Sequence, residues 1–197
     1  TMTRSSVRHI MICVLVAATL TACGDGGSDA TVSALPELGS APQFAGTNFT
    51  GAEVTQDELR GTVYVAYFFF TSCSGPCPVM NSKANVLQAA YADAEDFRIV
   101  GFSVDPENDS VQRLARYADR YSAKPGRWYM LRNSVEAVSD IASRGFKVGN
   151  ASQPDLHSTR FALVDREGKI RGYYDGLDDA KMDELRAAID FLLGRNT

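Results

Sequence analysis

Two cysteines and one histidine are the residues of this chain whose types and spacing could do chemistry. Cys73 and Cys77 stand in the segment CSGPC, which Pro78 follows, so three residues separate the two thiols. Thiolates are nucleophiles and metal ligands, so the pair could form a disulfide, act as a redox couple or hold a metal ion. His157 is the sole histidine after residue 22 and could add an imidazole nitrogen to the two sulfurs.

The cysteine pair lies at a predicted turn between a strand and a helix. Residues 62–70, TVYVAYFFF, are a continuous run of β-branched and aromatic residues, which predicts the central strand of a largely parallel sheet, buried on both faces. Pro78 has a fixed φ that suits the first helical turn, so we expect a helix from there to about residue 92. The positive end of that helix would lower the pKa of nearby thiols, and we expect both to be ionised near neutral pH.

The spacing and the donor atoms favour copper over zinc. Three intervening residues give a wider loop than the two residues of CxxC dithiol catalysts. Two thiolates suit Cu(I), and an imidazole broadens the site to Cu(II). A structural zinc site would need a fourth protein ligand, and no obvious candidate is present. We expect Met80 to pack in the core, and Asp105, Glu107 and Asp109 to serve as turn and capping groups.

The first residues predict export and a lipid anchor. Arg4 and Arg8 precede an uncharged apolar run over residues 10–20, which is too short for a membrane span and is typical of a signal peptide. Residues 20–23, LTAC, resemble a bacterial lipobox, so we expect cleavage after residue 22 and acylation of Cys23. An uncleaved anchor or an ordinary cleavage site is the alternative. The mature protein would then be tethered at the periplasmic face of a bacterial membrane, in an oxidising compartment.

Composition and patterning predict one α/β domain after a short tether. Residues 23–42 are rich in Gly, Ser, Ala and Asp and predict a flexible tether, and residues 43–197 would form a single domain. The net charge of −4 argues against nucleic acid as a partner, and we expect a monomer. The remaining expected strands are 98–104, 128–131, 159–164 and 170–174, the last two forming an antiparallel hairpin, and the remaining expected helices are 111–121, 134–142 and 178–193.

Three segments of the chain resemble the Sco/SenC family. FFFTSCSGPCPVM resembles the signature F-x-[FY]-T-x-C-x-x-x-C-P, FSVDPENDSVQRLARYA resembles the S-V-D-P-x-x-D segment, and DLHSTRFALVDREGKI is similar to the D-H-S segment with its hairpin. The three matches occur in order and cover much of residues 43–175. The resemblance implies a thioredoxin-like fold, with a mixed central sheet flanked by helices. It also implies that Cys73, Cys77 and His157 are copper ligands.

The resemblance also implies a role and a partner. Sco/SenC proteins help to assemble the dinuclear copper centre of cytochrome c oxidase, by delivering copper, by reducing the target's cysteines, or both. The expected partner is therefore the copper-binding subunit of that oxidase or another periplasmic copper protein. The alternative is a thiol-disulfide oxidoreductase that needs no metal. The chain departs from the usual pattern at Ser74 and Gly75, where many members have Pro and Asp, and at Arg166, where the hairpin often has Pro.

Overall fold

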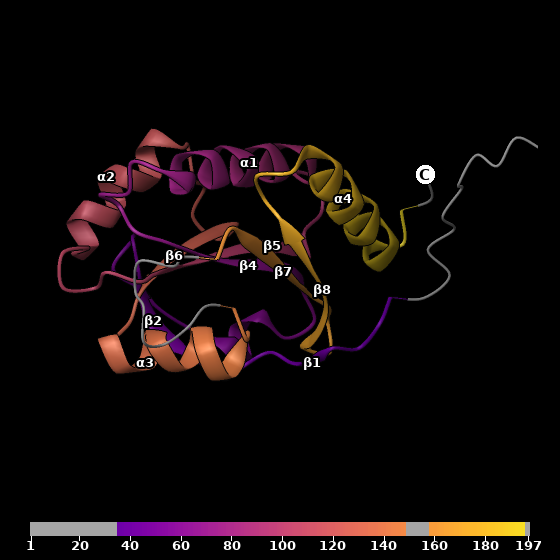
Figure 1. Ribbon diagram of the computed structural model, residues 1–197, viewed down its shortest axis with the longest axis horizontal. Coiled ribbons are helices and arrows are strands. Elements are labelled where there is room, and N and C mark those ends of the chain that lie inside the picture. The colour runs from indigo at the N-terminus through magenta and orange to yellow at the C-terminus, as the bar shows by residue number, and fades with distance from the viewer. Residues whose placement is uncertain (1–34, 149–157, 196–197) are drawn as a thin grey trace, which may run out of the picture. The chain divides into compact units, whose positions relative to one another are not determined.

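The computed structural model describes residues 35–148 and 158–195, which form a mixed sheet with helices on both faces (Figure 1). In chain order the strands are β1 Gly39–Ser40, β2 Ala45–Asn48, β3 Glu53–Thr55, β4 Val63–Phe69, β5 Phe97–Ser103, β6 Trp128–Arg132, β7 Arg160–Val164 and β8 Lys169–Asp175. The helices are α1 Pro76–Ala90, α2 Val111–Arg120, α3 Val135–Asp140 and α4 Asp179–Leu193, with a 3-10 turn η1 at Gln56–Leu59 and a π-helical turn η2 at Ile141–Gly145. The strand order is β1-β8-β7-β4-β5-β6-β2-β3.

Strand β4 lies in the middle of this sheet, as its residue pattern predicts, but the sheet is not largely parallel, since five of its seven strand pairings in the described residues are antiparallel. It pairs in parallel with β5 on one side and antiparallel with β7 on the other. All seven of its residues are buried, and successive side chains point to opposite faces of the sheet. Val65, Tyr67 and Phe69 enter the core on one face, whereas Tyr64 and Phe68 enter the core on the other.

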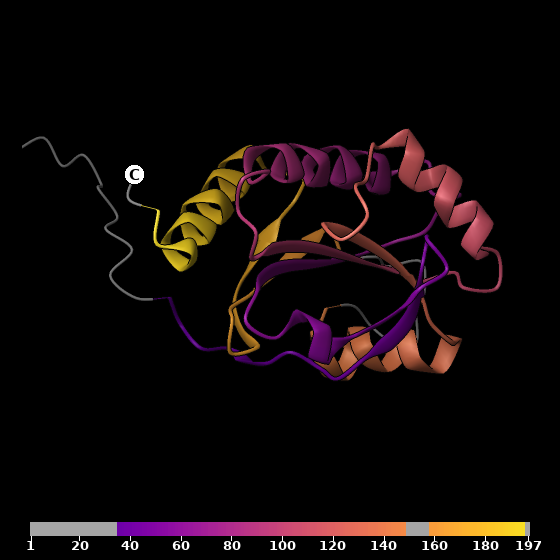
Figure 2. The same ribbon diagram turned by 180° about the vertical axis from the view of Figure 1, so that it is seen from behind.

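The two faces of the sheet are covered by different helices (Figures 1 and 2). Helices α1, α2 and α4 lie over one face and α3 lies over the opposite face. Leu87 of α1, Leu114 of α2 and Leu185 of α4 are each at most 1 % exposed and pack in the core of the first face. Val138 of α3 and Ile141 of η2 pack in the core of the second. The site-bearing turn therefore sits on a sheet that is held from both sides.

The predicted helices are confirmed, with one correction at the cysteines. Helix α1 begins at Pro76 rather than at Pro78, so Cys77 is already its second residue. Either proline suits a first helical turn, and the pattern alone does not choose between them. Serine caps both α2 and α3: Ser110 accepts a hydrogen bond from the backbone N–H of Arg113, and Ser134 accepts one from that of Ala137.

The folded domain begins earlier than residue 43, which corrects the expected end of the tether. The backbone N–H of Leu38 donates to the carbonyl of Ile170 at 2.9 Å, and that of Ala41 donates to the carbonyl of Gly168 at 2.8 Å. Strand β1 lies between these contacts and pairs with the edge of β8. Residues 38–41 contain few large apolar side chains, so their sequence does not predict this pairing. Backbone hydrogen bonds, which do not depend on residue type, hold the segment on β8.

The C-terminal hairpin and helix follow the prediction. Strands β7 and β8 pair antiparallel across residues 165–168, with an irregularity between Leu163 and Val164. Asp178 caps α4 by accepting hydrogen bonds from the backbone N–H groups of Ala180 and Lys181. In the described ranges, none of the helices combines the length and the apolar character that crossing a membrane requires. The predicted signal peptide and Cys23 lie outside those ranges.

Candidate metal centre

The cysteine pair is formed by the loop after β4 and the first turn of α1. Cys77 lies in the helix and is 1 % exposed, whereas Cys73 lies in the loop and is partly exposed. Both are free thiols, and they lie close enough for Cys73 to influence the pKa of Cys77. The backbone N–H of Cys73 donates to the carbonyl of Phe70 at 3.3 Å, which turns the loop directly after the strand. Two sulfur atoms are thus presented side by side, one of them accessible.

The protonation of Cys77 differs from the expectation. Burial raises the pKa of the Cys77 thiol to about 12, and the hydrogen bond and charge of Cys73 act in the same direction. A backbone hydrogen bond from Phe70 acts against this rise and is outweighed. The expectation that both thiols are ionised near neutral pH is therefore wrong for Cys77, because desolvation outweighs the effect of the helix N-terminus. A metal that binds here must displace a proton.

A buried hydrogen-bond network holds the first turn of α1. Asn81 is fully buried, and its Nδ2 donates to the carbonyl of Cys77 at 2.8 Å and to the hydroxyl of Tyr117 at 3.2 Å. The hydroxyl of Tyr67 donates to Asn81 Oδ1 at 2.7 Å and accepts from Trp128 Nε1 at 3.1 Å. The network links the cysteine to β4, α2 and β6. The sequence analysis did not identify Asn81. A polar residue on the apolar side of a helix, close to a cysteine, could have indicated a buried hydrogen-bond network there.

A buried carboxylate fixes the other end of the cysteine loop. Asp109 is 0 % exposed, and its Oδ2 accepts from the backbone N–H of Thr71 at 3.0 Å and from the Ser103 hydroxyl at 2.6 Å. Its Oδ1 accepts from the Thr71 hydroxyl at 2.5 Å. Arg113 Nε lies 3.8 Å from the same oxygen. The sequence predicts that Asp109 is a turn or capping group. In the structure it has a further role, because its hydrogen bonds to Thr71 and Ser103 join the loop before Cys73 to the end of β5.

The third predicted ligand cannot be placed. His157 lies outside the described residues, as does Cys23. Across residues 35–148 and 158–195, no three His, Cys, Asp or Glu side chains cluster as a metal site would require. The donor set that is described, two adjacent thiols, fits a soft metal ion such as Cu(I). Met80 is 1 % exposed in the core, which confirms its predicted packing role.

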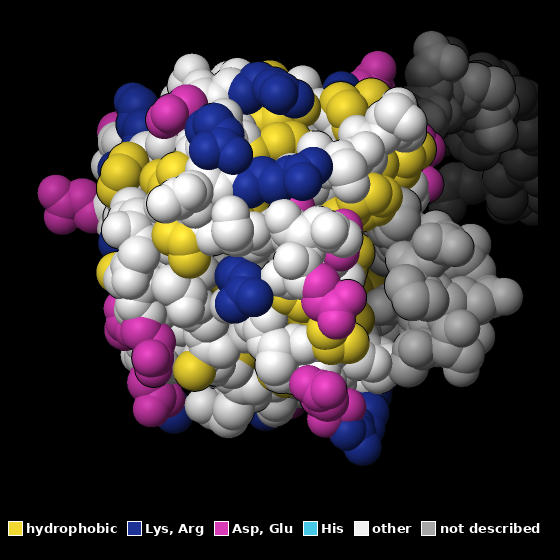
Figure 3. All heavy atoms as spheres, turned by 90° about the vertical axis from the view of Figure 1, so that its left-hand side faces the viewer, with side chains coloured by type: hydrophobic (Ala, Val, Ile, Leu, Met, Phe, Trp, Pro, Cys, Tyr) yellow, Lys and Arg dark blue, Asp and Glu magenta, His cyan; other side chains and the backbone are white. Residues whose placement is uncertain are grey.

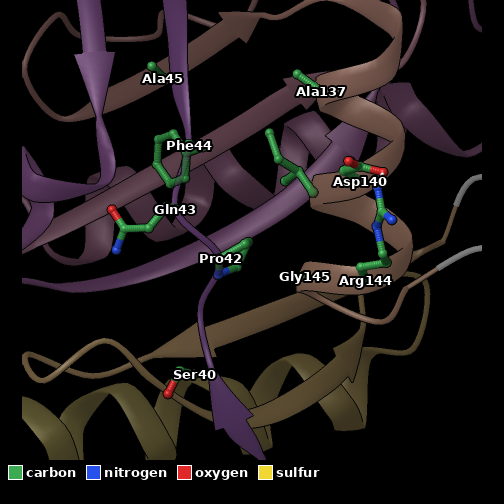
Figure 4. Close-up of a pocket in the computed structure, with 10 residues that line it drawn as sticks. Ser40, Pro42, Gln43, Phe44, Ala45, Ala137, Asp140, Arg144 and Gly145 are labelled. Atoms are coloured by element: carbon green, nitrogen blue, oxygen red, sulfur yellow. Dashed lines mark ion pairs between the residues drawn. The ribbon is translucent and has the colours of Figure 1, made fainter.

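A hollow on another part of the domain does not offer comparable chemistry. It has a volume of about 520 Å³ and lies between residues 40–45 and the α3–η2 segment (Figure 4). Asp140 and Arg144 are the charged residues that line it, and they form an ion pair with each other. The hollow contains neither cysteine, so the cysteine pair remains the candidate centre.

The fold and the site together define a class of protein: a thioredoxin-like domain with a dithiol at the turn between the central strand and the following helix. The SCO1/SenC family model matches residues 35–192. This match spans most of the chain and includes both cysteines. The chain belongs to the SCO1/SenC family.

Three known proteins show the range of this similarity. The SCO1 protein homolog of Bacillus subtilis is 32% identical over 149 residues, which cover 72% of this chain and 77% of that protein. BsSco, in which a disulfide switch has been identified, is a member of the Sco family of cytochrome c oxidase assembly proteins, and its sequence is 29% identical to this chain. The structural match covers 83% of this chain and 99% of BsSco, with a TM-score of 0.71. The structure of copper-bound ScoI of Arabidopsis thaliana has 23% sequence identity to this chain. The match covers 78% of this chain and 99% of ScoI, with a TM-score of 0.62.

Proposed function

We propose that this chain is an exported, lipid-tethered copper-binding protein that holds the ion with Cys73, Cys77 and His157. The observation that carries the proposal is the pair of adjacent free thiols at the β4–α1 turn of a SCO1/SenC family member. Two thiolates are soft ligands for Cu(I), and an imidazole nitrogen extends the site to Cu(II). The protein passes copper to the copper-binding subunit of cytochrome c oxidase or to another periplasmic copper protein.

The sheet register supports a place for His157 in this centre. Ala66 of β4 pairs with Ala162 of antiparallel β7, so the C-terminal end of β4 and the start of β7 at Arg160 lie side by side at the same end of the strands. The cysteine loop follows β4 at that same end. His157 precedes Arg160 by three residues, a span of at most about 10 Å of extended chain.

A backbone contact brings the start of β7 close to α1 as well. The N–H of Gly176 donates to the carbonyl of Thr159 at 2.7 Å. A Cβ at Gly176 would lie 2.2 Å from Met80 Sδ, so Gly176 lies against the residue one turn after Cys77. The described chain therefore resumes after His157 within the neighbourhood of the thiol pair, which supports the three-residue ligand set.

The chain's own residues explain how such a centre would load. Because Cys77 is buried and neutral in the apo protein, copper must displace its proton, and acid should weaken binding. Asp109 and Asn81 hold the loop and the helix turn on either side of the thiols, so little ordering remains when the metal binds. Oxidation of the pair to a disulfide would remove both sulfur ligands.

A copper titration with a histidine variant tests the ligand set. The reduced full-length protein is expected to bind one equivalent of copper, and His157→Ala is expected to lose or greatly weaken Cu(II) binding. His157 is the one histidine of the sequence after residue 22, so the change in Cu(II) binding reports on that imidazole. Unchanged Cu(II) binding by His157→Ala would remove His157 from the site.

The tether has its own test. Mass spectrometry of the mature protein is expected to find Cys23 as the first residue and a lipid attached to it. Cys23→Ala is expected to release the protein from the membrane fraction. An intact N-terminus that includes residues 1–22 would instead favour an uncleaved anchor.

A thiol-disulfide oxidoreductase is the second candidate function. The pair of one partly exposed and one buried cysteine favours it, because the accessible thiol can attack a partner disulfide and the buried thiol can resolve the product. Each turnover would oxidise Cys73 and Cys77 to a disulfide and reduce one partner disulfide to two thiols. Turnover on a model disulfide in the absence of copper would establish this function, and turnover that requires copper would exclude it.

A further inference from the structure

Three arginines form a stripe along α2 near the cysteine loop. Arg113, Arg116 and Arg120 are spaced i, i+3 and i+7, which places them on one side of the helix. Arg116 and Arg120 are exposed, and the Arg113 side chain is 42% exposed. Figure 3 shows the end of the domain where α2 lies, and Lys and Arg side chains gather over its upper part. This cluster runs against the net charge of −4 of the whole chain.

The last arginine of the stripe contacts a tyrosine that lies near the thiols. The Arg120 guanidinium carbon lies 5.7 Å from the centroid of the Tyr117 ring. Tyr117 is buried and interacts electrostatically with both Cys77 and Cys73. The ring of Tyr117 also stacks on Phe69, the last residue of β4, with 5.5 Å between the centroids. The side of α2 that carries the stripe therefore borders the cysteine loop.

The first arginine of the stripe makes a second connection to the loop. Arg113 Nε is 3.8 Å from Asp109 Oδ1, and Asp109 binds the backbone and the hydroxyl of Thr71. Thr71 is two residues before Cys73. Two independent contacts thus place the arginine stripe at the rim of the candidate copper site.

The outer part of the stripe carries no ion pair with any of the described residues. Within residues 35–148 and 158–195, neither Arg116 nor Arg120 forms an ion pair, whereas exposed arginines elsewhere, such as Arg60 and Arg186, pair with acids three residues away. Asp119 follows Arg116 by three residues, a spacing at which helical side chains are neighbours, but within the described residues no ion pair joins the two. Two exposed guanidinium groups beside a metal-exchange site are therefore available to a partner.

We propose that the arginine stripe of α2 docks an acidic surface of the protein that exchanges copper at Cys73 and Cys77. This inference rests on the proposed function. In the exchange, copper keeps its oxidation state, its bonds to the two sulfurs and to any imidazole ligand break as bonds to the partner's ligands form, and the thiolates regain protons from water. The partner's ligands must come within bonding reach of Cys73, so its contact surface must include the rim on which the stripe lies.

The position of the stripe favours a protein over an anionic membrane. A bilayer that engaged Arg116 and Arg120 would lie against the rim of the site and block access to Cys73. An acidic protein surface can satisfy the same guanidinium groups and present its own ligands to the sulfur. Complementary charge of this kind raises the rate of encounter more than the stability of the complex, and salt screens it.

The experiment measures copper transfer from the loaded full-length protein to the copper-free, soluble copper-binding domain of the same organism's cytochrome c oxidase subunit. The test variant is Arg116→Glu/Arg120→Glu, which leaves Arg113 and Asp109 in place. Lys181→Glu/Arg186→Glu on α4 is the matched control, because it makes the same charge change at the opposite end of the helical layer (Figure 1). Each protein is assayed at about 0.02 M and about 0.5 M salt, which changes the screening length severalfold.

We expect transfer by the test variant to be about tenfold slower at low salt, with the difference largely abolished at high salt, and copper stoichiometry to stay at one. Equal transfer rates for the test variant, the control and the unmodified protein would overturn the docking surface and leave the proposed function intact. Loss of bound copper in the test variant would overturn it too, because the arginines would then act on the site itself. Vesicle binding that depends on anionic lipid and on these arginines would assign the stripe to the membrane. Failure of the unmodified protein to bind or transfer copper would count against the proposed function.

Discussion

Protonation at a single residue sets the behaviour of the apo site. Cys77 is buried, and the pKa of its thiol is raised to about 12 from an ordinary value near 9. A folded-state pKa above that of the unfolded chain means that the folded protein retains a proton which the unfolded chain releases. The resulting contribution to stability is complete below pH 9 and is lost as the pH rises toward 12.

The free energy of unfolding of the reduced protein should therefore fall at alkaline pH. We expect a loss of about 1 kcal/mol between pH 9 and pH 10 from Cys77, before the buried tyrosines contribute. Urea unfolding at pH 8, 9 and 10 measures it. Cys77→Ser, which has no thiol to titrate, should show a smaller slope over this interval. An identical slope in both proteins would mean that Cys77 does not carry this proton.

A second residue-scale prediction concerns Asp109. Asp109→Asn leaves the size of the side chain unchanged but replaces an acceptor of the Thr71 N–H or hydroxyl by a donor. We expect a loss of about 1–3 kcal/mol in the free energy of unfolding and a changed Cu(II) spectrum, because the loop before Cys73 is no longer fixed. Glu107→Gln is the matched control, since it is also a change from carboxylate to amide and Glu107 is exposed in the β5–α2 loop that contains Asp109. An unaltered spectrum in Asp109→Asn would mean that the carboxylate has no part in positioning the site.

At the scale of elements, the strand-turn-helix unit that carries the cysteines could be predicted and its N-terminal neighbours could not. The buried run that became β4, and the capping residues of α2 and α3, follow rules of periodicity and capping that one segment contains by itself. Strands β1, β2 and β3 are two to four residues long, and β1 pairs with β8, β2 with β6, and β3 with β2. Short edge strands of this kind are set by their partners rather than by their own residues.

The site shows the same division between local and long-range information. The positions of Cys73 and Cys77 at the turn follow from the segment itself. The raised pKa of Cys77 and the contacts of Asp109 and Asn81 depend on packing between segments far apart in the chain, and spacing along the sequence does not contain that information.

The contact between the β8–α4 turn and α1 gives an element-scale prediction. A Cβ at Gly176 would lie 2.2 Å from Met80 Sδ and 2.8 Å from Phe161 Cε2, so Gly176→Ala forces the Met80 side chain and the Phe161 ring to move. We expect a loss of about 1–3 kcal/mol in the free energy of unfolding. Met80→Ala should relieve the clash, so the double variant should lose less than the sum of the single losses. Strictly additive losses would show that the two residues do not press on each other.

At the scale of the whole domain, an arginine joins the hairpin to two distant segments. Arg166, in the turn between β7 and β8, pairs with Asp96 before β5 and donates to the carbonyl of Leu192 at the end of α4. The side chains of Arg166 and Asp96 are each 39% exposed, so solvent weakens the pair. The residue stands where the family often has proline, and here it fastens the end of the chain to the sheet.

Loss of this contact should be measurable but modest. Arg166→Ala is expected to lower the free energy of unfolding by about 1 kcal/mol, because an ion pair and a hydrogen bond to α4 are removed together. Arg60→Ala is the matched control, since Arg60 pairs with Asp57 on an open surface and its loss should cost little. If the two variants are equally stable, Arg166 contributes nothing beyond an ordinary surface arginine.

The most direct measurement of the central claim is a copper titration of the full-length protein in its dithiol form and in its disulfide form. Two neighbouring thiols that act as ligands predict one equivalent of copper in the dithiol form, none in the disulfide form, and none in Cys73→Ser/Cys77→Ser. One equivalent of copper bound equally well after oxidation would contradict the claim, because the metal would then be held somewhere other than at these sulfurs.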